Sequence, residues 1–350
     1  MTKAAELAKM GEVLTNSQIG GRRNIIINGA MQVAQRGTSF TSVAASAYHL
    51  DRFRTGMGDT SARFTVTQAT AGLNGFAKSL KYDCTTAESS LSNADARLFI
   101  QHRLEGQDLQ QLKKGTSDAE KVTVSFYVKT NKSGVYTVEL YDNDNTRSIS
   151  QTITVSDANW NRYTLTFDGD TTGTLGNDNG NSFNLIIHLI AGTNYTGGTF
   201  STSWSSATDN TRVSSSNVNI GDSTDNNFEI TGIQMEIGSQ ATPFEHRSFG
   251  EEQRLCQRYF EVLFATRVAT YASTGSSVQR QGHQMKVTKR ALPTITDADN
   301  VYSTLGVTVT WEATNAQSNP NIEYIWAIIA DATSGEFGRY DRKLTLDAEL

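Results

Sequence analysis

The chain contains very little cysteine and proline, and these scarcities bear on how the fold can be held together. Its 350 residues include two cysteines, Cys84 and Cys256, and three prolines. Two thiols so far apart in sequence are more typical of buried small side chains than of a disulfide. There is no Cys-x-x-Cys pair and no Cys/His cluster of the kind that binds zinc. A chain of this length can bury a core without such links, so we predict no metal and no cofactor.

Basic blocks and long apolar runs are also missing. Lys and Arg number 31 against 36 Asp and Glu, for a formal net charge of −5, so we predict no nucleic-acid partner. The longest apolar run, residues 184–191, is shorter than the ~18 residues of a membrane span and contains His188. The N-terminus lacks the basic and then apolar pattern of a secretory signal. These features predict a protein that folds in a reducing cytoplasm and does not insert into a membrane.

Thr, Ser, Asn and Gly are abundant instead, and they suit β-strands with polar outer faces joined by polar turns. Hydrophobic and polar residues alternate with period two in residues 122–129, 136–140 and 163–167, which places one face of each segment in a core. Residues 183–190 are apolar on both faces and are predicted to be central in a sheet. The predicted fold class is mainly β, with an antiparallel β-sandwich of jelly-roll type.

One predicted strand contains an irregularity. Phe228 and Ile230 occupy even positions in the chain, whereas Ile233 and Met235 occupy odd ones. The parity changes at Gly232, where a β-bulge would insert one residue and restore a single apolar face. We therefore predict a bulge at this glycine.

Two helical segments are expected to flank the β-rich region. In residues 1–23, Leu7, Met10 and Leu14 form a short apolar stripe, which we predict to be buried between molecules. Three copies of the stripe could meet on an axis as a bundle, or the helix could dock on another protein. Packing of the stripe on its own subunit is the remaining alternative.

The second helix is predicted for residues 248–264, with Ser248 and Glu251 as its capping box. Strands resume after about residue 269. The chain is therefore predicted to have three parts, namely an attachment helix and hinge (residues 1–23), a jelly-roll domain (24–248) and a smaller β-domain led by one helix (249–350).

Two motifs resemble tail-fibre and virion structural proteins of tailed bacteriophages. The first is residues 24–38 (NIIINGAMQVAQRGT), which residues 48–53 (YHLDRF) follow. The second is residues 230–245 (ITGIQMEIGSQATPFE), which continue into residues 255–261 (LCQRYFE). Strands between the two motifs are similar to those of carbohydrate-binding-module jelly rolls, chiefly residues 122–129 and 160–167.

The resemblance implies a location in the virion tail, reached after assembly in the host cytoplasm. It also implies a homotrimer, attachment to other phage tail proteins at the N-terminus, and contact with host cell-surface polysaccharide. The smaller β-domain (residues 249–350) is expected to be distal and to carry receptor contacts. The resemblance implies no enzymatic activity. Two alternatives stay open: an architectural tail adaptor or baseplate component without glycan binding, and a host polysaccharide depolymerase.

The long polar stretch of residues 191–227 is the predicted location of the glycan-binding site. Sugars stack their apolar faces on exposed aromatic rings and exchange hydrogen bonds with amides and charged groups. The candidate residues in this stretch are Tyr195, Trp204, Asp209, Asn210 and Arg212. For Trp204 the alternative is a structural role, in which its ring fills a gap beside an edge strand.

Two further features have ordinary structural interpretations. His188 is predicted to be a packed, hydrogen-bonded core residue, and residues 142–145 (DNDN) fit a hairpin turn. Oxygen-rich turns can also bind calcium, although this one lacks the spacing of an EF-hand. No nucleophile elbow and no His-Glu-x-x-His motif indicates catalysis, so we predict that the protein is not an enzyme.

Overall fold

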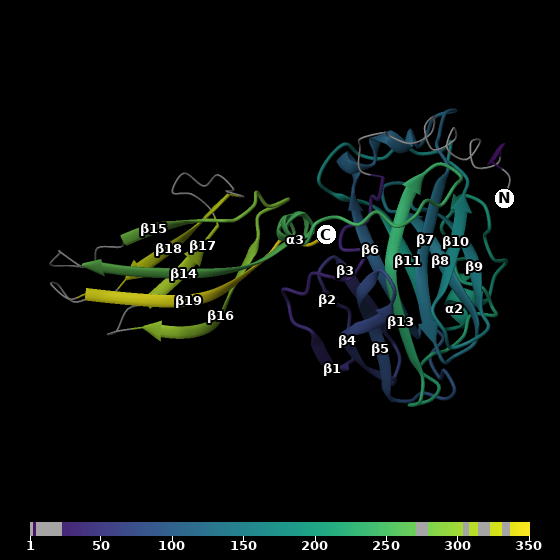
Figure 1. Ribbon diagram of the computed structural model, residues 1–350, viewed down its shortest axis with the longest axis horizontal. Coiled ribbons are helices and arrows are strands. Elements are labelled where there is room, and N and C mark those ends of the chain that lie inside the picture. The colour runs from purple at the N-terminus through teal and green to yellow at the C-terminus, as the bar shows by residue number, and fades with distance from the viewer. Residues whose placement is uncertain (1–2, 5–22, 271–278, 304–307, 314–322, 331–336) are drawn as a thin grey trace. The chain divides into compact units, whose positions relative to one another are not determined.

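The computed structural model describes residues 3–4, 23–270, 279–303, 308–313, 323–330 and 337–350. It confirms the mainly β, antiparallel fold class. The chain divides into two compact units, Met1–Ser248 (unit 1) and Phe249–Leu350 (unit 2) (Figure 1). The predicted attachment residues Leu7, Met10 and Leu14 lie outside the described residues. In the part of the chain that is described, no helix is long and apolar enough to cross a membrane.

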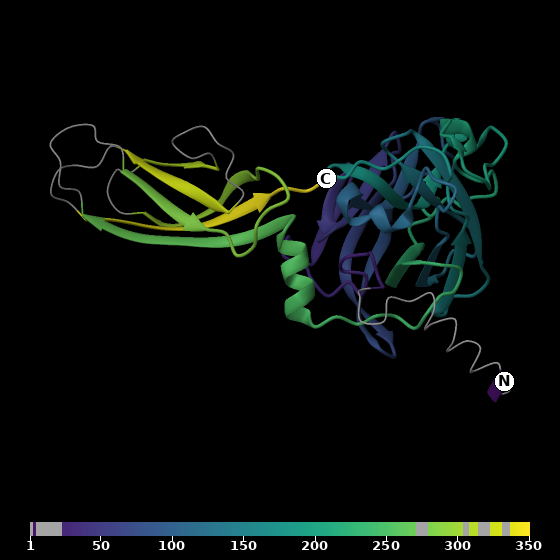
Figure 2. The same ribbon diagram turned by 90° about the horizontal axis from the view of Figure 1, so that it is seen from above.

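Unit 1 is a sandwich of two antiparallel sheets (Figures 1 and 2). Sheet A contains, in spatial order, β1 (Ser39–Val43), β4 (Arg63–Leu73), β5 (Phe76–Thr86), β13 (Asn227–Ile237), β7 (Val122–Thr130) and β10 (Asn161–Phe167). Sheet B contains, in spatial order, β12 (Ser205–Ser206), β9 (Arg147–Val155), β8 (Gly134–Asp142), β11 (Asn181–Ala191), β6 (Arg97–Glu105), β3 (Phe53–Gly58) and β2 (Ala47–Leu50). Buried side chains from both sheets form one hydrophobic core.

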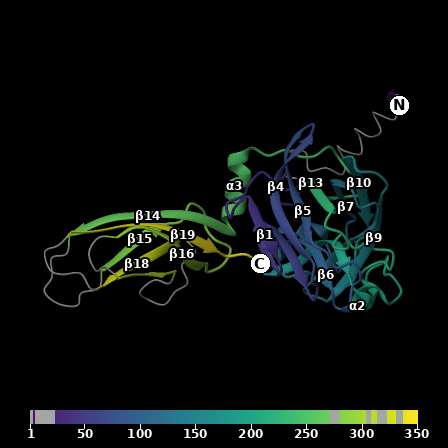
Figure 3. The same ribbon diagram turned by 90° about the horizontal axis from the view of Figure 1, so that it is seen from below.

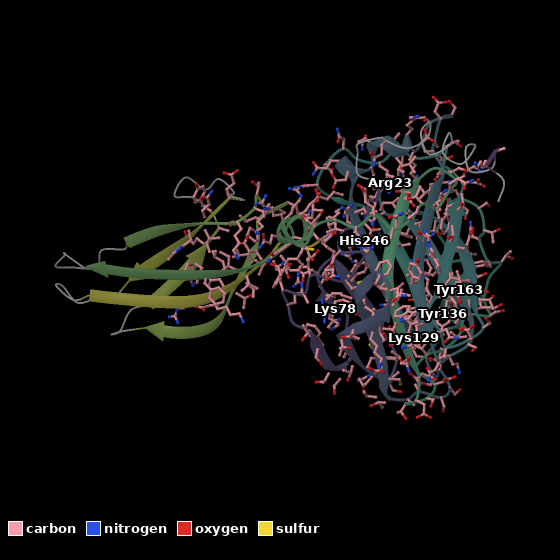
Figure 4. All side chains as sticks on the ribbon, viewed as in Figure 1. Arg23, Lys78, Lys129, Tyr136, Tyr163 and His246 are labelled. Atoms are coloured by element: carbon pink, nitrogen blue, oxygen red, sulfur yellow. The ribbon has the colours of Figure 1, made fainter. Side chains whose placement is uncertain are left out.

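The alternating segments of the sequence supply this core. Phe126 of β7 and Val138 of β8 are fully buried, and burial of such a side chain stabilises the fold by roughly 1.5–3 kcal/mol. Tyr136 is also buried, with its hydroxyl donating to the Lys132 carbonyl at 2.7 Å (Figure 4). β11 pairs with β6 on one side and β8 on the other. The segment that is apolar on both faces is therefore central in sheet B, as predicted.

Gly232 forms the predicted bulge in β13. The register of β13 against β7 shifts between Thr231 and Gln234, and Gly232 has a φ of +62°. A Cβ at this position would lie 2.8 Å from the Phe76 ring and 2.9 Å from the Tyr127 ring. Glycine is therefore needed both for the backbone conformation and for the close approach of two aromatic rings.

The segments 24–38 and 230–245 lie side by side in unit 1, and we call their contact region, residues 24–29 with residues 233–247, the clasp. The Asn24 side chain accepts a hydrogen bond from the Met235 amide at 3.1 Å and donates one to the Ile233 carbonyl at 3.2 Å. The Ile233 amide in turn donates to the Gly29 carbonyl at 3.0 Å. A Cβ on Gly29 would lie 2.1 Å from that same Ile233 carbonyl oxygen, so glycine permits the approach.

Charged side chains complete the clasp. The Glu245 carboxylate accepts hydrogen bonds from the backbone amides of Arg23 at 3.0 Å and Asn24 at 2.7 Å. The Arg247 guanidinium donates to the Ile26 carbonyl at 3.0 Å and also to the Asn24 carbonyl. The motifs therefore join the beginning of the described part of unit 1 to its end, and their polar groups satisfy backbone donors and acceptors.

Unit 2 begins with α3 (Phe249–Gln257) and continues as two antiparallel sheets, whose strands are shown in Figure 3. One sheet pairs β19 (Phe337–Asp347) with both β14 (Phe260–Thr270) and β16 (Thr294–Ser303). The other pairs β18 (Tyr324–Ala330) with both β15 (Gln279–Gln284) and β17 (Thr308–Glu312). Leu344 and Leu346 of β19 are fully buried in the core of this unit. Across the chain, Cys84 and Cys256 are both buried and form no disulfide, as predicted.

The helix predicted for residues 248–264 is shorter than expected. α3 ends at Gln257, and the chain then enters β14. Leu263 is 9% exposed and Ala265 is fully buried, whereas Phe264 between them is 68% exposed. This is the alternation of a strand. A short apolar run fits both helical and strand periods, and pairing along the whole length of β19 decides between them.

Candidate glycan-binding site

The outer face of sheet B, which is turned away from the core, collects polar and aromatic side chains. In β11, Leu185 and Ile187 enter the core. Asn184, Ile186 and His188 alternate with them and therefore belong to the outer face. All three of these residues are nevertheless buried, so part of the outer face must be covered.

The covering segment is residues 192–220, which lie within the polar stretch singled out in the sequence. Ser205 pairs with Ser148 of β9, and the Ser150 amide donates to the Ser201 carbonyl at 3.0 Å. The segment also contains two short helices, α2 (Thr193–Thr196) and η3 (Asp209–Thr211). It therefore lies over β8 and β9 and continues the hydrogen bonding of sheet B.

Arg212, a predicted binding residue, anchors this segment. Its Nε and Nη2 donate to the two carboxylate oxygens of Glu139 at 2.7 and 3.1 Å. Its guanidinium carbon lies 4.8 Å from the centre of the Tyr141 ring, and its Nη1 donates to Asp209 at 3.2 Å. His188 Nε2 lies 2.9 Å from the same Glu139 carboxylate, which confirms that this histidine is packed and hydrogen-bonded.

These partners keep Glu139 ionised although it is fully buried. Burial raises the pKa of the Glu139 carboxyl, but the Arg212 charge and the His188 hydrogen bond outweigh it, and the pKa lies below its usual range. Burial lowers the pKa of Arg212, but Glu139 and Asp209 outweigh this and raise it. The contacts of Arg212 therefore stabilise the fold of the segment, and a contact of Arg212 with glycan stays a prediction.

Trp204 packs against the sandwich, and a contact of its ring with glycan stays a prediction. It is half-buried, and its Nε1 donates to the Asp168 carbonyl at 2.7 Å. Its ring lies 6.0 Å from the Phe183 ring, between centroids, and 5.4 Å from Lys114 Nζ. The indole therefore packs beside the core of the sandwich.

Tyr195 and Asn210 lie on the same segment. The Tyr195 hydroxyl accepts a hydrogen bond from Arg97 Nη1 at 2.5 Å. Asn210 is exposed, and its carbonyl accepts from the Gly198 amide at 2.7 Å. Because Arg97 belongs to β6, Tyr195 stands at the border between the covered part of the outer face and the part on β3 and β6.

The outer face is more accessible on β3 and β6 than on β8 and β9. We call this part, together with the adjoining Asn184 of β11, the arginine face, and its residues are Arg54, Phe99, Gln101, Arg103 and Asn184. Strand pairing sets Arg54 opposite Gln101 and Arg103 opposite Asn184. Arg54, Phe99 and Arg103 are half-buried, whereas Gln101 and Asn184 are buried. The arginine face therefore combines an aromatic ring, two amides and two guanidinium groups on neighbouring strands.

One amide oxygen holds the two guanidinium groups together. Gln101 Oε1 accepts from Arg54 Nη1 at 3.2 Å and from Arg103 Nε at 3.1 Å. Burial lowers the pKa of Arg54, the charges of Arg103 and Arg97 lower it further, and Tyr48 opposes them. The two guanidinium groups therefore lie close enough for their positive charges to act on each other, although the whole chain is acidic.

Phe99 lies over a glycine of the neighbouring strand. A Cβ on Gly56 would lie 2.1 Å from two ring atoms of Phe99. Gly58 lies on the same side of β3 and pairs with Arg97. A Cβ on Gly58 would lie 3.3 Å from the Arg97 guanidinium nitrogens, which is a looser contact. Because these outward positions of β3 carry no side chain, the Phe99 ring can rest on the sheet and remain partly exposed.

Asn184 contributes a polar group that lacks a protein partner. Its Oδ1 is buried and accepts no hydrogen bond from the described residues. Buried polar atoms nearly always have a partner. This oxygen has almost no accessible surface, so the groups that the arginine face offers to a ligand are the Phe99 ring for stacking and the guanidinium groups for hydrogen bonding and charge.

The arginine face is not apparent in the sequence, because its residues come from three strands that are distant in sequence. A signal was nevertheless present in residues 97–103 (RLFIQHR). The core side chains Leu98 and Ile100 alternate with outward residues that are unusual for a solvated strand face, namely Arg97, Phe99, Gln101 and Arg103. An aromatic ring and an amide between two arginines are typical of a binding surface.

The turn at residues 142–145 is a hairpin between β8 and β9. The buried Asp142 carboxylate accepts from the Lys114 ammonium and from the Asn145 amide and side chain, the last two at 3.1 and 2.9 Å. Lys114 also pairs with Asp170 at 3.0 Å. A lysine thus stands where calcium was considered. Among the residues described, no cluster of three or more His, Cys, Asp or Glu side chains could hold a metal ion.

Comparison with known proteins gives likenesses of fold at low similarity. No family model and no curated protein matches the sequence. The enzymatically active domain of tailspike protein 4 of bacteriophage CBA120 is 10% identical, with a TM-score of 0.32, and the match covers 61% of this chain but 21% of that one.

Two carbohydrate-binding modules of Clostridium thermocellum are similar to the same degree. The family 11 module of a cellulosomal cellulase is 11% identical, with a TM-score of 0.29, and the match covers 57% of this chain and 99% of that one. The C-terminal family 22 module of Xyn10B is 9% identical, with a TM-score of 0.30 and coverages of 59% and 98%. Likenesses at this level carry no argument about ligand or activity.

Proposed function

We propose that the protein is a tail fibre or receptor-binding protein of a tailed bacteriophage, and that unit 1 binds host-surface glycan at the arginine face. The observation that carries the binding proposal is the position of Phe99 on Gly56, next to Gln101 and Arg54. A partly exposed ring can stack on the apolar face of a sugar, while the amide and guanidinium groups bind its hydroxyls. Tyr195 borders this surface.

The phage assignment is supported by the motifs at residues 24–38 and 230–245, which resemble tail-fibre and virion proteins. In our proposal residues 1–23 attach the protein to another tail protein, and three copies form a fibre. Several weak glycan sites on one particle then act together, because each bound site raises the effective concentration of the next.

We propose a binding protein and not a depolymerase. Glycoside hydrolysis commonly needs two carboxyl groups that reach the substrate. In the outer row of sheet B that contains Arg54, the carboxyl group is that of Glu139, which is fully buried and held by Arg212 and His188. Such a group stabilises structure and is poorly placed to protonate or attack a sugar.

The test is glycan binding by the full chain, measured on a glycan array and then by calorimetry with the bound glycans. We expect Phe99→Ala to weaken binding about 5- to 100-fold, because a stacking contact and its buried area contribute about 1–3 kcal/mol. Lys81→Ala on the outer face of sheet A is the matched control and should bind normally. Failure of the folded chain to bind any host glycan would count against the proposed site.

An architectural role is the second candidate, and unit 2 supplies the observation that favours it. Phe264 is 68% exposed and Phe249 is 57% exposed, and large exposed apolar side chains often mark protein interfaces. Under this alternative unit 2 packs on another virion protein. Antibody labelling of intact particles would decide: access to unit 2 at a distal tip favours the fibre, and inaccessibility together with absent glycan binding favours the adaptor.

A further inference from the structure

The charges on the outer face of sheet B are unevenly distributed. Arg54, Gln101, Ile186 and Glu139 follow one another in a single cross-strand row from β3 to β8. With strands ~4.8 Å apart, the carboxylate end of the row is about 14 Å from Arg54. Glu139 is also already neutralised by Arg212. The acid in this row therefore does not balance the charge of Arg54.

The Arg54 guanidinium group has one hydrogen-bond acceptor among the described residues. Nη1 donates to Gln101, which is neutral, and among the described residues Arg54 has no carboxylate partner. Arg97, on the same face, approaches Asp59 no closer than 4.0 Å, and both side chains are more than 40% exposed. A partly buried cation without a carboxylate partner, as Arg54 is among the described residues, favours a ligand that brings negative charge.

We propose that the saccharide bound at the arginine face is acidic, and that its carboxylate or sulfate group pairs with Arg54 beside the sugar ring that stacks on Phe99. This inference rests on the proposed function and adds the chemical class of the glycan. A neutral sugar would satisfy the ring and the amides but would leave Arg54 without an anionic partner.

The experiment compares ligands that differ in charge and share a backbone. The full chain is titrated at fixed ionic strength with polygalacturonate and with its methyl ester, and in parallel with dextran sulfate and unsubstituted dextran. We expect at least one acidic form to bind about 10-fold or more tightly than its neutral counterpart, as charge-assisted hydrogen bonds of this kind usually contribute. The two pairs distinguish carboxylate from sulfate.

Variants of Arg54 test whether the negative charge of the ligand is recognised at the arginine face. Arg54→Gln should weaken binding of the acidic form about 10-fold or more and weaken any neutral binding much less, so that the ratio of acidic to neutral affinity falls. Arg54→Lys, which keeps the charge but loses the planar fork, should lie between the two. Lys81→Ala removes a cation from sheet A and should have no effect.

The outcomes separate this inference from the proposed function. Equal binding of neutral and acidic forms, abolished by Phe99→Ala, would overturn the acidic preference and retain the glycan site. Acidic binding that survives Arg54→Gln would overturn the role of Arg54. Binding of single-stranded DNA as tightly as the acidic glycans, with the same loss in Arg54→Gln, would overturn the saccharide assignment. Absence of all binding would overturn the proposed function itself.

Discussion

Asn24 and Met235 stand 211 residues apart in sequence, and a buried hydrogen bond of 3.1 Å joins the Met235 amide to Asn24 Oδ1. The same Oδ1 accepts from the Ile26 amide at 3.0 Å. One short side chain thus joins the segments 24–38 and 230–245. At this point of unit 1 the two segments therefore have a structural role, because their contact closes the sandwich.

Asn24→Ala should destabilise unit 1 strongly. The change leaves two buried backbone amides without acceptors, and each buried donor left unpaired costs about 1–3 kcal/mol. We expect a loss of about 2–4 kcal/mol in the free energy of unfolding, measured by urea denaturation. Asn143→Ala in the exposed turn after β8 is the control and should change it by less than about 0.5 kcal/mol. Similar stability of the two variants would show that the clasp is not needed for folding.

Gly56→Ala should disturb the binding surface more than the fold. The new Cβ would meet Phe99 at 2.1 Å, so the ring must leave its place on β3. Overpacking of this kind usually costs about 1–3 kcal/mol, and glycan binding should fall with it. The matched control is Gly58→Ala on the same strand, where the nearest atom is the flexible Arg97 side chain at 3.3 Å.

The double variant Gly56→Ala/Phe99→Ala separates the two effects. It relieves the clash and should recover part of the stability, because the ring is gone, but it should not recover binding. Thermal denaturation and calorimetric titration of the four proteins give both readouts. Full binding by Gly56→Ala would show that the position of the Phe99 ring does not matter for the ligand.

Glu139→Gln should loosen the segment of residues 192–220. The change removes the buried Glu139 carboxylate from the Arg212 guanidinium, which is 18% exposed. Breaking a buried ion pair on one side costs about 3–5 kcal/mol, and partial exposure of Arg212 places the expected loss near the lower limit. Proteolysis of the segment should become faster.

The matched control removes the other acidic partner of Arg212. Asp209 is 70% exposed, and surface ion pairs contribute about 0–1 kcal/mol, so Asp209→Ala should change stability little. If Glu139→Gln and Asp209→Ala had equal small effects, Arg212 would not be the anchor inferred from the structure.

The stability of unit 1 should fall as the pH is lowered from 6.5 towards 4. His49 is buried, and burial followed by the Arg36 charge lowers its pKa from 6.5 to about 4. The folded state therefore favours neutral His49. The stability that His49 contributes is complete above pH 6.5, and it is lost below that pH, because His49 becomes protonated in the unfolded chain before it does so in the folded one. At pH 5 the loss should be on the order of 2 kcal/mol for this residue.

Urea denaturation between pH 7 and pH 5 checks this expectation. His49→Gln should flatten the pH dependence in that range, because the group that titrates is gone. The pKa of the Glu88 carboxyl is lowered to about 2 despite the opposing effect of burial, by hydrogen bonds from Thr60, Ser61 and Ser92. The contribution of ionised Glu88 to the stability of unit 1 is therefore retained between pH 7 and pH 5, and it declines only below about pH 4.5. An unchanged slope in His49→Gln would assign the pH dependence to other groups, such as His102, whose pKa burial also lowers.

The local sequence pattern was sufficient to predict a strand or a bulge where burial of one face constrained residues that are close together in sequence. Period-two alternation identified β7, β8 and β10 because each has one face in the core. The change of parity at Gly232 identified the bulge, since only an inserted residue brings Phe228 and Met235 to one face. The same reasoning was wrong for residues 258–264, because a short apolar run is compatible with both a helix and a strand.

The sequence by itself thus determined the class of fold, the central strand and the bulge, because backbone geometry and burial act over a few residues. Only the tertiary structure decided which polar residues meet. Strand pairing brought Arg54, Gln101 and Asn184 together from distant segments, and folding of residues 192–220 engaged Arg212 with Glu139. A long-range register leaves no local pattern, because its partners are selected by the packing of the whole sandwich.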